Sequence, residues 1–145
     1  MHLVNNVPKT SKDRLIPVCE KVFLNSPVIF AYLYGSYATG MMHPFSDIDI
    51  AVYAAEKSFE NPLDLELSLS IEIDRALKEK PKSDVRLINR LPLAVLGEIM
   101  KDGLLIYCRD DEFRIDYETT VRMGYFDFLL YLRKYQQTYL NRMPR

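Results

Sequence analysis

One stretch, residues 28–52, constrains the fold more than any other part of the chain. An apolar run rich in β-branched and aromatic residues breaks at Gly35 and Ser36, and a second apolar run opens with Asp47 and Asp49. Apolar runs separated by a glycine-containing break are typical of two strands joined by a turn. The sequence therefore predicts strand, phosphate-sized turn and strand in this order.

Two carboxylates open the second of these strands. Successive side chains of a strand point to opposite faces, so Asp47 and Asp49 are expected on one face, about 7 Å apart. Carboxylates that converge on one space repel each other unless a cation lies between them. Mg²⁺ takes oxygen ligands and is held by one or two carboxylates together with substrate phosphates. The pair is therefore a candidate Mg²⁺ site.

The turn before these carboxylates has the residues that a phosphate site needs. Gly35 has no Cβ, so the backbone can turn tightly there and approach a phosphate closely. Ser36 follows it and offers both a hydroxyl group and a backbone N–H. The turn is therefore a candidate binding site for the phosphates of a nucleotide.

The string GSxAxG at residues 35–40, followed by SDID at residues 46–49, resembles a known signature. It is similar to that of the minimal nucleotidyltransferases (MNT), small members of the DNA polymerase β-like superfamily. The resemblance covers residues 10–108 and implies an α/β (α+β) fold in which helices pack a small mixed sheet. It also implies Mg²⁺ as cofactor and ATP as co-substrate. We expect residues 1–110 to form the nucleotidyltransferase domain.

One position departs from the commoner family pattern, which has Arg where this chain has Thr39. The chain therefore lacks one cationic phosphate contact, although the Thr39 hydroxyl remains available to a phosphate. Arg86 follows Asp84 by two residues in a predicted strand and so lies on the same face. We hypothesise that Arg86 partly replaces the missing charge.

A third carboxylate, Asp84, opens a short predicted strand at residues 82–89. The spacing alone leaves open whether Asp84 joins the other carboxylates or is merely solvated at a strand edge. The resemblance places the third acidic residue of the family here. It implies that Asp84, with Asp47 and Asp49, is catalytic and binds the metal, either as a further ligand or as the base that takes a proton.

Helices are predicted between the strands, over residues 10–25, 61–80 and 91–102, with a last short strand at 104–107. The second of these segments is ambiguous, because leucine and isoleucine alternate with polar residues from Leu63 to Ile73, which alone indicates a strand. Asn61 and Pro62, however, are typical of a helix start, and Leu63, Leu67 and Ile71 are also i, i+4 neighbours. We therefore predict a helix.

Residues 111–145 are predicted to form a long helical extension that packs on the same domain. Between 111 and 141 there is no proline and a single glycine, Gly124, where the helix is expected to break if it breaks at all. Beyond Leu132 we expect Tyr135 and Tyr139 to be exposed beside basic residues. Aromatic residues and Arg are enriched at interface cores, so this end is a candidate partner surface for a helix-pair contact.

The composition is that of one cytoplasmic domain. The 145 residues, 48% of them hydrophobic, suffice for one sizeable core. There is no membrane-length apolar run and no signal-peptide pattern after Met1. Cys19 and Cys108 have neither metal nor disulfide spacing. A net charge of −1 argues against broad nucleic-acid binding. We therefore expect neither a membrane partner nor a direct nucleic-acid partner.

The resemblance also implies a function, because the family is best known as the antitoxin half of HEPN/MNT toxin–antitoxin pairs. The expected partner is a HEPN-domain ribonuclease toxin, to which AMP is transferred from ATP at a tyrosine hydroxyl. Two alternatives stay open. A binding-only antitoxin is favoured by Thr39 and opposed by the retained carboxylates. A transferase for a small molecule such as an aminoglycoside would be favoured by an acidic pocket outside the metal triad.

Overall fold

The computed structural model describes residues 11–40, 47–78 and 82–143. Four strands form one sheet in the order β3-β2-β1-β4. Their bounds are β1 (Val28–Tyr34), β2 (Ile48–Ala54), β3 (Ser83–Leu87) and β4 (Leu104–Cys108). β2 and β3 run parallel, whereas β1 is antiparallel to both β2 and β4. The sheet is therefore mixed, as predicted.

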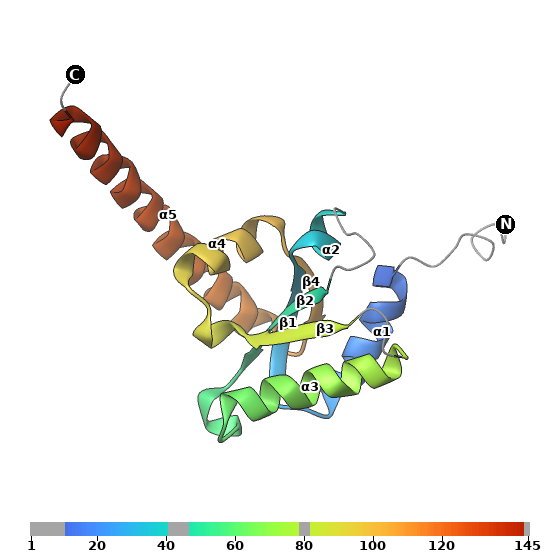
Figure 1. Cartoon of the computed structure of the whole chain (residues 1–145). Coiled ribbons are helices and arrows are strands. Elements are labelled where there is room, and N and C mark those ends of the chain that lie inside the picture. The colour runs from blue at the N-terminus through green and yellow to red at the C-terminus, as the bar shows by residue number, and fades with distance from the viewer. Residues whose placement is uncertain (1–10, 41–46, 79–81, 144–145) are drawn as a thin grey trace, which may run out of the picture.

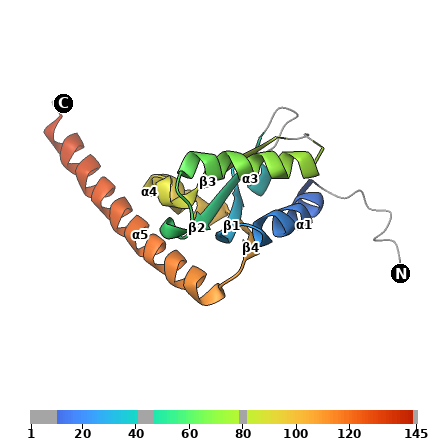
Figure 2. The ribbon, with the colours of Figure 1, turned by 90° about the horizontal axis from the view of Figure 1, so that it is seen from below.

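Helices cover both faces of this sheet (Figures 1 and 2). They are α1 (Ser11–Leu24), α2 (Ser36–Thr39), α3 (Pro62–Ala76), α4 (Leu93–Asp102) and α5 (Asp111–Arg142), with 3-10 turns η2 (Glu56–Ser58) and η3 (Ile88–Arg90). α1 and α3 pack on one face, and α4 with the first half of α5 packs on the other. Within the described ranges no helix is both long and apolar enough to cross a membrane.

Helix α3 begins where the sequence predicts and ends earlier. The Asn61 side chain accepts hydrogen bonds from the N–H groups of Leu63 and Asp64, and Pro62 takes the first helical position. The helix ends at Ala76 instead of near residue 80, and Lys78 has the left-handed backbone (φ 60°) that commonly follows a helix end.

Two apolar faces on α3 explain its ambiguous sequence pattern. Leu69 and Ile73 are buried in the core. The i, i+4 row that favoured a helix is exposed instead, and it consists of Leu63, Leu67 and Ile71. The alternation of apolar and polar residues therefore arises because the helix has a second apolar face that the sheet does not cover.

The outer edge of β3 is closed by side chains of α3. Three backbone N–H groups of the strand donate to the helix: Ser83 to Asp74 (2.7 Å), Val85 to Ser70 (3.1 Å) and Leu87 to Glu66 (2.7 Å). The three acceptors are four residues apart, so they lie along one face of the helix. The amide groups that would bind a further strand are thus satisfied within the chain.

Helix α5 continues through Gly124 without a break. Its first half is anchored, with Val121 buried and the Tyr125 ring packed closely against Gly97 of α4. Its second half runs away from the sheet (Figure 1), where Tyr135 is 61% and Tyr139 is 54% exposed. The expected exposure of these two tyrosines is confirmed.

Candidate active site

Asp49 lies at the centre of a row of side chains that crosses three strands. Its register partner in β1 is Tyr34, and its register partner in β3 is Asp84. Paired residues of neighbouring strands are about 5 Å apart and point to the same face, so these side chains adjoin. Asp47 is exposed just before β2 and acts electrostatically on Asp49. Strand register thus brings Asp84 beside Asp49, which the spacing had left open.

Gly35 packs directly against this row. Its backbone (φ 72°, ψ −151°) lies in a region that is essentially restricted to glycine. A Cβ at this position would lie 2.5 Å from Asp49 Oδ2, so a side chain here would force the carboxylate or the turn to move. The sequence predicted a tight glycine turn. The structure adds that the Asp49 carboxylate occupies the space that a side chain at residue 35 would fill.

The turn predicted after Gly35 contains a single helical turn, α2. The Gly35 carbonyl accepts hydrogen bonds from the N–H groups of Ala38 (3.1 Å) and Thr39 (3.2 Å). Ser36 takes the first helical position, where the N–H has no partner within a helix and is available to a ligand. The Thr39 hydroxyl is directed back at the Gly35 and Ser36 carbonyls, both at 3.4 Å. Ser46, the first residue of the SDID string, lies outside the described residues.

The charges at the site disfavour ionised Asp49. Burial raises its pKa, and the neighbouring carboxylates of Asp84 and Asp47 raise it further, whereas Arg86 lowers it. Tyr34 is affected in the same way, because burial and Asp49 raise its pKa to about 12. The site therefore has an excess of negative charge that a bound cation would relieve.

The three carboxylates fit Mg²⁺ by their chemistry, since all of their donor atoms are oxygens. Within the described part of the chain, however, they are not already gathered into a metal-binding cluster. Asp84 is instead bound by Arg86, whose Nε lies 3.3 Å from Asp84 Oδ2. Arg86 thus shares a face with Asp84, as predicted, and Asp84 would have to exchange this ion pair for a metal.

Comparison with known families identifies the protein family that has this arrangement. The family described as "Polymerase beta, Nucleotidyltransferase" matches residues 17–112, which include the Gly35 turn and all three carboxylates. The chain belongs to this family. The nucleotidyltransferase fold that the sequence predicted is thereby confirmed. No curated protein matches the chain.

Solved structures with the same fold include chains of toxin–antitoxin complexes. One, crystallised with AMP-PNP, is 19% identical at a TM-score of 0.61, and the match covers 91% of this chain and 97% of that one. Another is the complex of a tri-AMPylated Shewanella oneidensis HEPN toxin with an MNT antitoxin (17% identity, TM-score 0.54, 97% of both chains). A third is the MntA-HepT pair (15% identity, TM-score 0.55, 90% and 93%).

Sequence reasoning did not find two acidic residues beside the turn of this nucleotidyltransferase. Glu98 and Asp102, near the end of α4, line a cavity of about 190 Å³ together with Gly35 and Thr39. Tyr34, which also lines it, was likewise missed as a neighbour of Asp49. Tyr34 directly precedes Gly35, and this was the only sequence signal that it lies at the site. Nothing in the spacing of residues in α4 indicated that the end of this helix meets the turn.

The raised pKa of Asp49 predicts how metal-free stability depends on pH. A group whose folded-state pKa lies above its ordinary value, here 3.8, stabilises the fold at low pH and loses that contribution as the pH rises through the raised pKa. The melting temperature of the wild type minus that of Asp49→Asn, measured in EDTA, should therefore be lower at pH 7 than at pH 4. A difference that stays constant or rises with pH would contradict this.

Arg86 is predicted to contribute to nucleotide binding in place of the cation missing at Thr39. Arg86→Ala should weaken ATP affinity about three- to tenfold, because a charge-assisted phosphate contact is lost at an exposed site. Arg90→Ala is the matched control, since Arg90 pairs with Glu66 instead. Calorimetric titration with ATP measures both, and an unchanged affinity in Arg86→Ala refutes the hypothesis. Thr39→Arg should restore affinity in the Arg86→Ala background.

Proposed function

We propose that this nucleotidyltransferase is an antitoxin that transfers AMP from ATP to a tyrosine hydroxyl of a HEPN ribonuclease toxin. The observation that carries the proposal is the Gly35 turn packed against Asp49, with Asp84 in register beside it. Likeness to chains from complexes with AMP-PNP and with a tri-AMPylated HEPN toxin supports the choice of nucleotide and partner.

Each residue has a proposed role in binding ATP. Gly35 and Ser36 seat the β- and γ-phosphates, the glycine by allowing close approach and the serine through its N–H and hydroxyl. Asp47 and Asp49 would hold Mg²⁺, and Asp84 would be either a further ligand or the group that accepts the proton. When bound, that ion would neutralise negative charge on the reacting phosphates. Thr39, whose hydroxyl already has partners in α2, would contribute a weaker contact.

The transfer step needs alignment and one proton acceptor. The tyrosine oxygen attacks the α-phosphorus, the bond from that phosphorus to the oxygen bridging the β-phosphate breaks, and pyrophosphate leaves. The hydroxyl proton goes to a carboxylate, and we assign this role to Asp84, which lies on β3, the edge strand of the sheet. Tyrosine becomes a phosphodiester with AMP, which adds bulk and negative charge to the toxin.

Position-specific labelling of ATP tests this assignment. The chain is incubated with its cognate HEPN protein, Mg²⁺ and ATP labelled on either the α- or the γ-phosphate. The proposal predicts protein-bound label from the α-position alone, and its loss when the acceptor tyrosine is replaced by phenylalanine. Label from the γ-position would indicate phosphoryl transfer and would overturn the proposal.

A small-molecule transferase is the second candidate, and one observation favours it. Glu98 and Asp102 place two carboxylates in the cavity beside Gly35, outside the proposed metal ligands. Such a pocket suits a cationic acceptor like an aminoglycoside. The volume, about 190 Å³, is below the range of ordinary ligand sites, which start near 300 Å³. The labelling assay with an aminoglycoside in place of the HEPN protein distinguishes the two candidates.

A further inference from the structure

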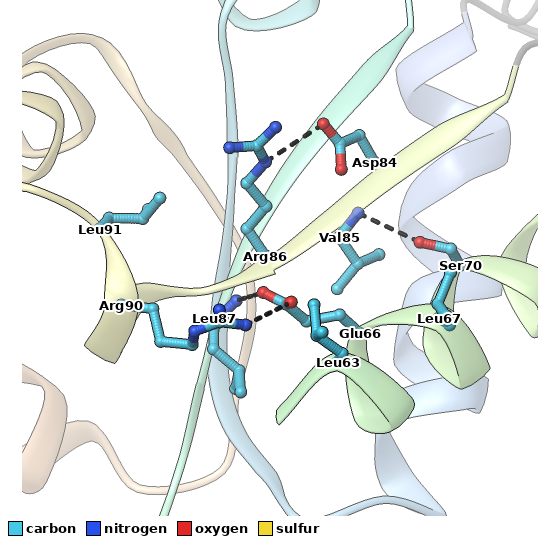
Figure 3. Close-up of a pocket in the computed structure, with 10 residues that line it drawn as sticks. All are labelled: Leu63, Glu66, Leu67, Ser70, Asp84, Val85, Arg86, Leu87, Arg90 and Leu91. Atoms are coloured by element: carbon cyan, nitrogen blue, oxygen red, sulfur yellow. Dashed lines mark hydrogen bonds and ion pairs between the residues drawn. The ribbon is translucent and has the colours of Figure 1, made fainter. Parts of the chain in front are cut away.

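A groove of about 360 Å³ crosses the outer edge of β3 next to the proposed active site (Figure 3). Leu63 and Leu67 of α3 form one side. Asp84 and Arg86 of β3, with Arg90 and Leu91 beyond it, form the other. The groove therefore joins the uncovered apolar face of α3 to the carboxylate that we propose as the proton acceptor.

The two α3 leucines of this groove lie outside the core. Leu63 is 56% and Leu67 is 61% exposed, and Ile71 continues their row at the same spacing. The opposite face of α3, with Leu69 and Ile73, supplies the core contacts. Leucines four residues apart make a straight stripe with about 6 Å between neighbours. Such a stripe suits the apolar side chains of a second helix.

The strand edge limits how a ligand can bind here. The N–H groups of Ser83, Val85 and Leu87 are already satisfied by α3, so an extended peptide cannot add to the sheet at these amides. A ligand must bind through side chains instead. Arg90 offers a polar contact, because its one hydrogen bond among the described residues is from Nη1 to Glu66, which leaves further N–H donors.

We propose that this groove is the docking site of the acceptor protein, and this inference rests on the proposed function. The occupant is a helix of the HEPN protein. Its apolar side chains lie between Leu63, Leu67 and Leu91, and a carboxylate meets Arg90. Because Asp84 belongs to both the groove and the active site, a helix seated here delivers a tyrosine from its end to the proposed proton acceptor.

Binding without nucleotide tests docking separately from chemistry. The double variant Leu63→Ser, Leu67→Ser should bind the unmodified HEPN protein at least tenfold more weakly in biolayer interferometry. Its affinity for ATP and its melting temperature should stay within error of the wild type, because both side chains are exposed. Leu24→Ser, at a leucine that is 65% exposed at the end of α1, is the matched control and should bind normally. Arg90→Glu provides a second, charge-based disruption of the same groove.

The outcomes separate this inference from the proposed function. If the α3 variant and Arg90→Glu both bind the HEPN protein like the wild type, the docking site is wrong, whether or not AMP is transferred. Loss of binding in Tyr135→Ser, Tyr139→Ser alone would assign docking to α5 and overturn the inference. If only the groove variants lose binding and the wild type transfers no AMP, the docking site stands and the transferase function fails.

Discussion

Replacing Asp49 by asparagine should lower AMP transfer by at least about 10³-fold, because a central carboxylate of the proposed metal site is lost. The fold should not suffer, since burial and two like charges already disfavour ionised Asp49. We expect the metal-free variant to melt at or above the wild-type temperature at neutral pH. Transfer is measured by intact mass of the acceptor protein over time.

Asp127→Asn is the control for this substitution, because Asp127 is exposed on α5 away from the sheet. It removes the same charge and should leave transfer unchanged. An Asp49→Asn protein that retains more than about a tenth of wild-type transfer would show that Asp49 holds no essential metal, since the loss would amount to less than about 1.4 kcal/mol.

Gly35→Ala should abolish ATP binding and destabilise the fold by about 1–3 kcal/mol, the cost of a side chain in a glycine-only backbone region. The new Cβ would lie 2.5 Å from Asp49 Oδ2, so either the turn or the carboxylate must move. The turn and the carboxylate are both proposed to contact the nucleotide. We therefore expect a larger loss of ATP affinity than the loss of folding stability alone would cause. Urea unfolding and calorimetric titration with ATP measure the two effects.

Gly40→Ala separates backbone strain from the effect on the site. Gly40 also has a positive φ, 79°, but no atom lies within 4 Å of the position that its Cβ would occupy. The variant should therefore lose about 1–2 kcal/mol of stability for its left-handed backbone and keep its affinity for ATP. Equal losses of ATP affinity in the two variants would mean that the contact between Gly35 and Asp49 has no special role.

Local chemistry explains why the centre of this fold could be predicted from sequence. The Gly35 turn lies only fourteen residues before Asp49 in the chain, so a strand, a glycine turn and a second strand suffice to relate the two. The start of α3 is likewise fixed by Asn61 and Pro62, which act within one turn. These features depend on a few consecutive residues, which is why their pattern can be recognised in the sequence.

Features that depend on tertiary register were not predictable from the residues alone. That Asp84 lies beside Asp49 depends on the parallel pairing of β2 with β3, which only the family resemblance indicated. The exposed face of α3 could not be recognised, because Leu63 and Leu69 are the same residue type and differ only in what covers them. The meeting of Glu98 with the Gly35 turn follows from the packing of α4, for which the chain gives no local signal.

The central claim, that the three carboxylates and the Gly35 turn transfer AMP to a protein, is tested most directly by mass. The cognate HEPN protein is incubated with this chain, Mg²⁺ and ATP, beside the double variant Asp47→Asn, Asp49→Asn, and its intact mass and ribonuclease activity are recorded. The account predicts a gain of one or more AMP units and loss of ribonuclease activity with the wild type only. Unchanged mass, together with a toxin that the double variant silences equally well, would contradict it and assign the function to binding alone.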